Sequence, residues 1–193
     1  EAQQLFDRAL RKCAEVLNTV PNDTWALCNE GLTLLCIGEK HLENNDDVGA
    51  LKTFADGRAA FERLLTLTPS DDEALAGLGA LYFYEGEAIR KTDRTQAITK
   101  YRQSSEAFDE ALANGSEDAE TEADKARTLQ RLGEIYLETD RRKDALRSLN
   151  DALKAYDHSL KIAPRHLRAR EARRRLKALL AGLRTSSPRN QGG

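Results

Sequence analysis

The 193-residue sequence contains no methionine, one tryptophan, four prolines and three cysteines, and only 6% of its residues are aromatic. Few prolines together with 32% charged residues are typical of a soluble helical chain. No apolar run is long enough to span a membrane, and no secretory signal pattern is present. We therefore expect a cytoplasmic protein with no membrane partner. Because the chain starts at Glu1, we expect it to be a fragment of a longer protein.

Motifs that carry catalysis are also missing. There is no phosphate-binding loop, no glycine-rich dinucleotide fingerprint and no nucleophile elbow. The three histidines have no nucleophile or metal ligand at a helical spacing: His41, His158 and His166. A metal at His41 with the acidic turn of Glu43, Asp46 and Asp47 is conceivable, but such turns are far more often solvated. We predict a protein that is not an enzyme and that holds no cofactor or metal.

The cysteines are odd in number and lack the spacing of a metal site: Cys13, Cys28 and Cys36. We interpret them as small hydrophobic side chains, buried or lining a groove, in a reducing compartment. A redox or disulfide role is the alternative.

One pattern recurs along the whole chain. A small residue followed four positions later by a bulky one occurs at Ala2/Phe6, Ala50/Phe54, Ala97/Tyr101 and Ala145/Leu149, with spacings of 48, 47 and 48 residues. A glycine precedes three of these pairs, at Gly31, Gly79 and Gly133, and prolines punctuate the chain at Pro21, Pro69 and Pro164. Coincident registers of this kind indicate a repeat architecture.

The clearest copy reads Leu129, Leu132-Gly133, Tyr136, Ala145, Leu149, Tyr156 and Pro164. This resembles the tetratricopeptide repeat (TPR), a helix–turn–helix unit with a period of about 34 residues. The resemblance implies an all-α protein, an α-solenoid in which antiparallel helix pairs form a right-handed superhelix. The longer period predicts helices of near twenty residues.

The pattern divides the chain into parts. We predict a single repeat domain over 1–184, consisting of a half repeat (1–20), three repeats (21–68, 69–115 and 116–164) and a capping helix (165–184) docked on the helix before it, with a disordered tail at 185–193. Ser70 and Glu73 have the spacing of a capping box, and Ser116 is placed to cap the helix after it.

The resemblance also implies a binding groove, because first helices of TPR repeats line a concave surface across which peptides lie. The corresponding positions are Trp25, Cys28, Leu32, Leu35 and Cys36 in the first full repeat, Glu73, Ala76, Ala80, Phe83 and Tyr84 in the second, and Arg127, Gln130, Arg131, Glu134, Leu137 and Glu138 in the third. The first two sets are largely apolar and the third is charged. The alternative is that the apolar positions pack against the long second helices or against a missing N-terminal repeat.

Some family members grip a C-terminal carboxylate with Lys, Asn and Arg on these helices. Arg127 and Arg131 match such positions in kind, whereas the others hold Cys28, Leu32 and Gly77, which cannot donate charged hydrogen bonds. We therefore expect a mostly apolar peptide or amphipathic helix, with one acidic end near Arg127 and Arg131.

The last helix differs in composition from the rest. Residues 165–193 hold nine Lys or Arg and one Glu, a net charge of +8, which leaves −10 for the remainder. The basic patch comprises Arg168, Arg170, Arg173, Arg174 and Arg175. Our leading hypothesis is a non-enzymatic scaffold that binds a protein or peptide in the groove. The alternatives are contact of the basic helix with an acidic partner or nucleic acid, and self-association into a homo-oligomer; the basic patch could also be a solvated outer face.

Overall fold

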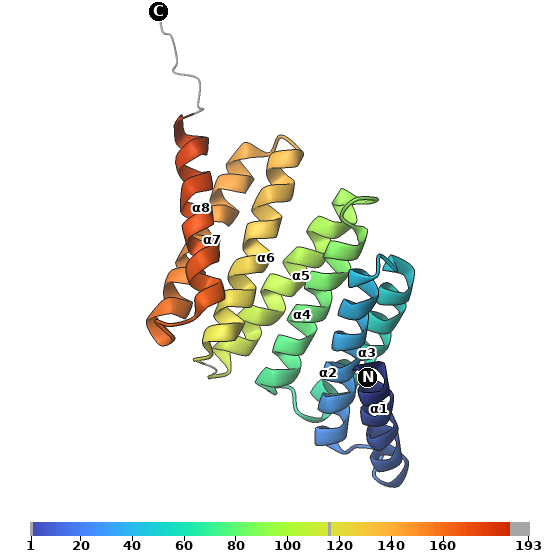
Figure 1. The fold of residues 1–193 in the computed structure, drawn as a ribbon. Coiled ribbons are helices and arrows are strands. Elements are labelled where there is room, and N and C mark those ends of the chain that lie inside the picture. The colour runs from blue at the N-terminus through green and yellow to red at the C-terminus, as the bar shows by residue number, and fades with distance from the viewer. Residues whose placement is uncertain (1, 116, 186–193) are drawn as a thin grey trace, which may run out of the picture. The chain divides into compact units, whose positions relative to one another are not determined.

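The computed structural model describes residues 2–115 and 117–185, and over these ranges the regular structure is helical throughout. The helices are α1 (Ala2–Thr19), α2 (Thr24–Glu43), α3 (Asp47–Leu67), α4 (Asp72–Ile89), α5 (Arg94–Ala113), α6 (Ala119–Glu138), α7 (Arg142–Ile162) and α8 (Leu167–Thr185), shown in Figure 1. Their lengths of 18 to 21 residues confirm the predicted helix length of near twenty.

The helices belong to two compact units, unit 1 with α1–α5 and unit 2 with α6–α8, which divide at Ser116 and Glu117. The sequence predicts a single domain, with a repeat junction between residues 115 and 116, and the bounds of its repeats stay a prediction. In unit 1, α2 pairs with α3 and α4 with α5, while α1 packs on α2, α3 packs on α4, and α2 lies beside α4. In unit 2, α6 pairs with α7, and α8 packs mainly on α7. None of the described helices has the length and apolar character needed to cross a membrane.

Aspartates start five of the helices. The side chains of Asp23, Asp46, Asp71, Asp93 and Asp118 each accept a hydrogen bond, of 2.7 to 2.9 Å, from the backbone N–H three residues later. A carboxylate in this position satisfies an orphan donor and interacts favourably with the positive end of the helix dipole. The capping box predicted from Ser70 is therefore wrong by one residue, and Asp118, rather than Ser116, caps α6; Ser116 itself lies outside the described residues.

The core of unit 1 depends on a close approach between glycines and one aromatic ring. The fully buried ring of Phe61 on α3 lies against Gly31 of α2 and Gly77 of α4. A Cβ added at Gly31 would lie 2.6 Å from Phe61 Cζ, and one added at Gly77 would lie closer still. The two glycines thus leave the space that lets one ring contact both first helices.

Unit 2 uses the same arrangement with a smaller partner. The fully buried Leu149 of α7 lies where a Cβ on Gly133 of α6 would be, at 2.6 Å from its Cγ. α8 packs mainly on α7 and also contacts α6, and it buries Ala169, Leu176 and Leu180 in the same core. α8 is thus fixed by an apolar stripe.

The contact between Gly77 and Phe61 predicts the effect of adding one methyl group. We expect Gly77→Ala to destabilise unit 1 by about 1–3 kcal/mol, because Phe61 is enclosed and cannot move aside. Urea unfolding followed by far-UV circular dichroism measures this cost, since the regular structure of the described residues is helical.

Two controls separate crowding from other effects. In a Phe61→Leu background the cost of Gly77→Ala should fall, since the two positions are coupled. Gly182→Ala, where the added Cβ meets nothing within 4 Å, should leave helix content and stability unchanged or raised. An equal cost of Gly77→Ala in both backgrounds would contradict the packing described.

Candidate functional site

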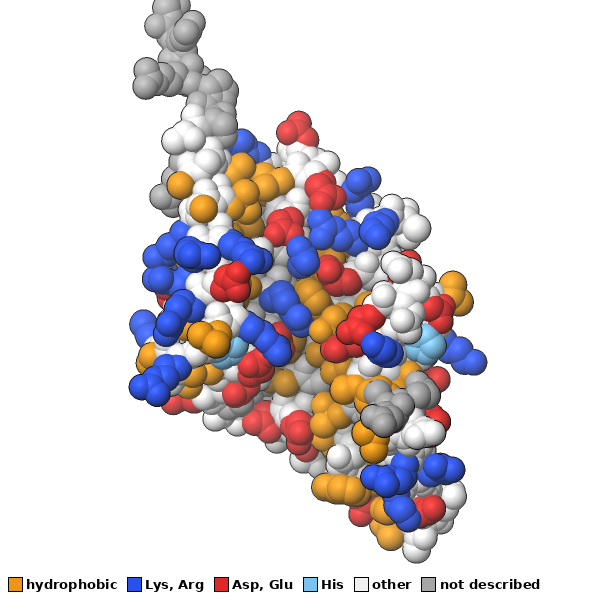
Figure 2. Space-filling view, viewed as in Figure 1, with side chains coloured by type: hydrophobic (Ala, Val, Ile, Leu, Met, Phe, Trp, Pro, Cys, Tyr) orange, Lys and Arg blue, Asp and Glu red, His pale blue; other side chains and the backbone are white. Residues whose placement is uncertain are grey.

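The predicted groove positions of unit 1 form an exposed apolar surface, here called the α2–α4 face: Trp25, Leu32, Leu35, Ala76 and Ala80. The Trp25 side chain is large and hydrophobic, yet the residue is 64% exposed. Leu32 and Leu35 are half-buried against the core of unit 1, and Ala76 and Ala80 are half-buried on α4. Spacings of three, four and seven residues place each set on one side of its helix. Figure 2 shows hydrophobic side chains gathered over α2 and α4.

Phe83 does not belong to this surface, although the TPR register predicts it. It is only 3% exposed, its ring edge meets Tyr84 at 5.1 Å between centroids, and Tyr101 of α5 lies 5.9 Å away. Tyr84 is half-buried and stacks on Phe54 at 6.0 Å. Aromatic rings of α3 and α5, those of Phe54 and Tyr101, lie at this end of α4, and Phe83 is part of the core.

Cys28 is also buried, as the cysteine interpretation allows, and is not a contact residue. Burial, together with the neighbouring carboxylates of Glu73 and Asp71, raises the pKa of its thiol to about 12. Cys28 and Glu73 form a side-chain hydrogen bond, which joins α2 to α4. Cys13 is buried as well, whereas Cys36 is exposed, and all three thiols are free of disulfides.

A buried ion pair that the sequence did not reveal stabilises the other side of α4. Glu85 is only 4% exposed, and its Oε2 lies 2.5 Å from Lys100 Nζ on α5. Lys100 Nζ also lies 5.1 Å from the centroid of the Tyr82 ring. Arg58 on α3 approaches both the Glu85 carboxylate and the Tyr82 ring. These partners are distant in sequence, so no local spacing indicated them.

Most groove positions of α6 in unit 2 are polar, whereas Leu137 packs against the core. Arg131 Nη1 donates to Glu134 Oε2 at 2.8 Å, and Gln130 Nε2 donates to Glu134 Oε1 at 2.9 Å. Arg127 Nη2 lies 3.2 Å from Asp124 Oδ1. The structure therefore brings Arg127, Gln130, Arg131 and Glu134 onto one helix surface, where both arginines already have carboxylate neighbours.

A small pocket of about 90 Å³ lies between α6 and α8. Acidic and basic groups face it together, namely Glu120, Asp124, Arg127, His166 and Arg168, and alanines and Tyr156 complete its wall. Burial raises the pKa of Tyr156 to about 12. The mixed charges balance, so the pocket favours no ligand of one sign.

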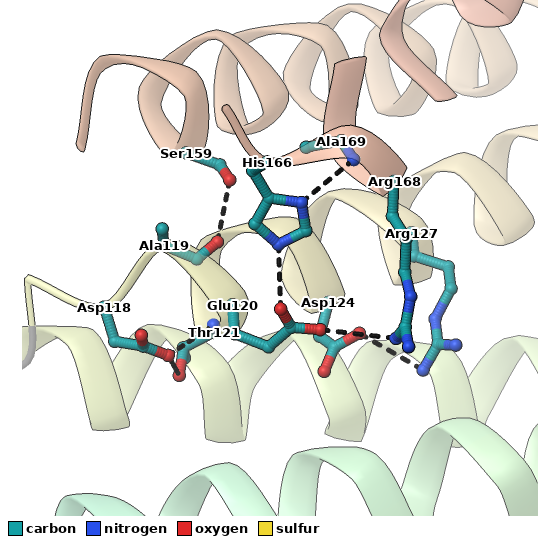
Figure 3. A network of polar contacts seen from close by, with 10 residues as sticks. All are labelled: Asp118, Ala119, Glu120, Thr121, Asp124, Arg127, Ser159, His166, Arg168 and Ala169. Atoms are coloured by element: carbon teal, nitrogen blue, oxygen red, sulfur yellow. Dashed lines mark hydrogen bonds and ion pairs between the residues drawn. The ribbon is translucent and has the colours of Figure 1, made fainter. Parts of the chain in front are cut away.

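His166 organises the start of α8, as Figure 3 shows. Its Nδ1 accepts a hydrogen bond of 3.2 Å from the backbone N–H of Ala169, so its Nε2 carries the proton and donates to Glu120 Oε2 at 2.8 Å. Arg168 Nη1 lies 3.6 Å from Glu120 Oε1. In the same network, burial opposes ionisation of Asp118, but hydrogen bonds from Thr121 outweigh it and lower the pKa of the Asp118 carboxyl. His166 thus has a capping role.

The five arginines of the predicted basic patch divide between packing and solvent. Arg173 pairs with Asp157 of α7, and Arg170 donates to the backbone carbonyl of Pro164. Arg175 pairs with Glu171 within α8, and Arg174 is exposed. The side chain of Arg168 is 88% exposed. Figure 2 shows basic side chains gathered over α8, and of the five only Arg173 fixes α8 to α7 by an ion pair.

Within residues 2–115 and 117–185, no group of three or more His, Cys, Asp or Glu side chains is arranged to hold a metal ion. The described residues form sequential antiparallel helix pairs. In these pairs, a bulky side chain of the second helix packs against a glycine of the first helix. The fold is TPR-like.

No family model and no curated protein matches the sequence. Solved structures match it over most of its length. The first TPR domain of human RPAP3 is 18% identical, with 83% of this chain and 99% of that chain covered and a TM-score of 0.46. A MamA crystal structure is 21% identical, with 95% and 79% covered and a TM-score of 0.46. The first TPR of Spaghetti (RPAP3), bound to the HSP90 peptide SRMEEVD, is 17% identical, with 79% and 94% covered and a TM-score of 0.41.

The burial of the thiols predicts their order of reactivity. At pH 8 we expect a maleimide or disulfide reagent to label Cys36 first, because it is exposed, and Cys28 last, because its pKa is raised to about 12 and little thiolate forms. Burial and then Glu39 also raise the pKa of Cys36, so its labelling should quicken as pH rises. Mass spectrometry identifies the labelled peptides.

Cys36→Ser is the control and should remove the fast phase. In urea all remaining thiols should react at similar rates. If Cys28 in the folded protein were labelled as quickly as Cys36, Cys28 would be accessible and would belong to the groove surface, as the sequence predicts.

Proposed function

We propose that this protein is a non-enzymatic interaction scaffold and that the α2–α4 face of unit 1 binds a peptide or helix of a partner protein. The observation that carries the proposal is the exposed Trp25 beside half-buried leucines on α2 and small alanines on α4. The contact between Cys28 and Glu73 aligns the two helices at this level, with Trp25 one turn before it and Ala76 one turn after it.

The chemistry of these residues suits binding. Burying a tryptophan removes about 150–250 Å² of surface from water, and tryptophan is enriched among residues that dominate binding energy. Ala76 and Ala80 have short side chains, so a ligand backbone can approach α4 closely. Leu32 and Leu35 are held against the core, which lowers the entropy that a ligand must remove on binding.

The charged face of α6 is a weaker candidate for the peptide site. Any ligand carboxylate at Arg127 or Arg131 has to compete with Asp124 and Glu134, which are already close to them. The acidic ligand end predicted from the sequence therefore stays a prediction, and we place the main contact on unit 1.

Peptides selected from a displayed library against the intact protein provide the test. We expect Trp25→Ala to weaken their binding by more than about tenfold, since a central aromatic anchor is lost. Ala80→Glu should weaken it similarly, by placing a bulky charge where the ligand approaches. The matched control is Val48→Ala, which removes apolar surface from a residue that is 81% exposed on α3 and should not alter binding.

Circular dichroism must show unchanged helix content in each variant. Selected peptides that bind Trp25→Ala and Ala80→Glu as tightly as the wild type would exclude the α2–α4 face. Equal losses in Val48→Ala would point to general apolar adhesion instead.

Contact of α8 with a polyanion is the second candidate function, because the side chains of Arg168 and Arg175 are 88% and 72% exposed. Binding to polyglutamate or to a single-stranded oligonucleotide should weaken steeply with salt, with a slope of about 0.7 per phosphate contact for a single strand. Replacing both Arg168 and Arg174 by Gln should lower the affinity and this slope.

Lys154→Gln on α7 is the control, since its side chain is equally open to solvent at 78% and lies outside α8. Binding that is absent at low salt, or that Lys154→Gln reduces as much as the α8 variant, would remove this candidate.

A further inference from the structure

α2 and α4 contain more acidic than basic side chains, although one of the acids, Glu85, lies on the other side of α4 and pairs with Lys100. α4 contains four acidic residues and no Lys or Arg: Asp72, Glu73, Glu85 and Glu87. α2 has a single Lys or Arg, Lys40, which pairs with Glu43 at 2.6 Å. Residues 1–116 as a whole hold 12 Lys or Arg and 20 Asp or Glu, a net charge of −8.

Two of these acids lie at opposite ends of the apolar surface. Glu73 precedes Ala76 by three positions and is exposed beside Cys28, near the Trp25 end. Glu39 follows Leu35 by four positions, so it lies on the same side of α2. Glu39 follows Trp25 by 14 positions, so the surface extends about 21 Å along α2.

The thiols next to this surface respond to the same carboxylates. After burial, the largest causes of the raised pKa of Cys28 are Glu73 and Asp71, and that of the raised pKa of Cys36 is Glu39. An acidic side chain therefore acts on a thiol near each end of the face.

We infer that the partner of the α2–α4 face is a basic amphipathic segment, with apolar side chains in its middle and Lys or Arg at both ends. This rests on the proposed function, and it adds the charge of the ligand. Long basic side chains suit such a surface, because their methylene stems lie on apolar residues while the charged heads reach the carboxylates. An acidic segment would meet like charge at both ends, which costs affinity and slows association.

Three synthetic peptides of about 14 residues, matched to the length of the face, distinguish the possibilities. They share the same leucine positions and differ in their ends, which carry Lys, Gln or Glu. Trp25 is the sole tryptophan and lies on the face, so a blue shift of its emission reports occupancy directly in the intact chain. We expect the Lys peptide to bind about three- to tenfold more tightly than the Gln peptide, and the Glu peptide to bind least tightly.

Salt gives a second readout. Raising it from about 0.1 M to about 1 M shortens the Debye length from about 10 Å to about 3 Å. The Lys peptide should therefore lose its advantage, while binding of the Gln peptide should persist or strengthen.

Neutral variants locate the effect. Glu39→Gln and Glu73→Gln should each weaken the Lys peptide about two- to fivefold and leave the Gln peptide unchanged. The matched control is Glu106→Gln, an exposed acid on α5, which should affect neither peptide.

The outcomes separate this inference from the proposed function. Equal binding of the Lys and Gln peptides, with a blue shift for both, would overturn the inference and leave the α2–α4 face as a neutral apolar site. Tighter binding of the Glu peptide would overturn it as well. Absence of any blue shift with all three peptides would count against the proposed function itself, and the inference would fail with it.

Discussion

The pairing of the helices depends on a bulky side chain from a second helix that fills the gap left by glycine in a first helix. Phe61 occupies such a gap between Gly31 and Gly77, and Leu149 does so at Gly133. A methyl group added to any of these glycines would overlap the buried side chain. The packing therefore constrains both the residue of the first helix, which has to be small, and the side chain of the second helix, which has to fill the gap. Because the second helices fill the space behind α2 and α4, the opposite sides of these helices are left to the solvent, where Trp25 is found.

The two units present different chemistry on equivalent helices. In unit 1 the first helices show apolar side chains bounded by acids, whereas α6 in unit 2 shows arginines joined to their own carboxylate neighbours. When a ligand covers an exposed apolar surface, the burial of that surface contributes favourable free energy to binding. Arginines that are already paired with carboxylates gain little from a further pair with a ligand. This difference is why we propose unit 1 as the site of binding.

The sequence was sufficient to predict the helix pairs, because glycines and bulky residues recur at the fixed spacing that this packing requires. It also indicated which residues of α2 and α4 share a side. It failed at Phe83, since Tyr101 and Tyr84 cover this residue only once the long helices have packed. The ion pair of Glu85 with Lys100 was missed for the same reason, whereas the pair of Arg131 with Glu134 follows from their i,i+3 spacing.

The central claim is that the α2–α4 face is open to solvent in the isolated protein. Acrylamide quenching of Trp25 fluorescence tests it most directly, since no other tryptophan contributes. A residue that is 64% exposed should be quenched almost as readily as a free tryptophan amide and should emit as an indole in water. Strong protection from acrylamide at low protein concentration would show that the chain covers this face with its own side chains, and would contradict the account.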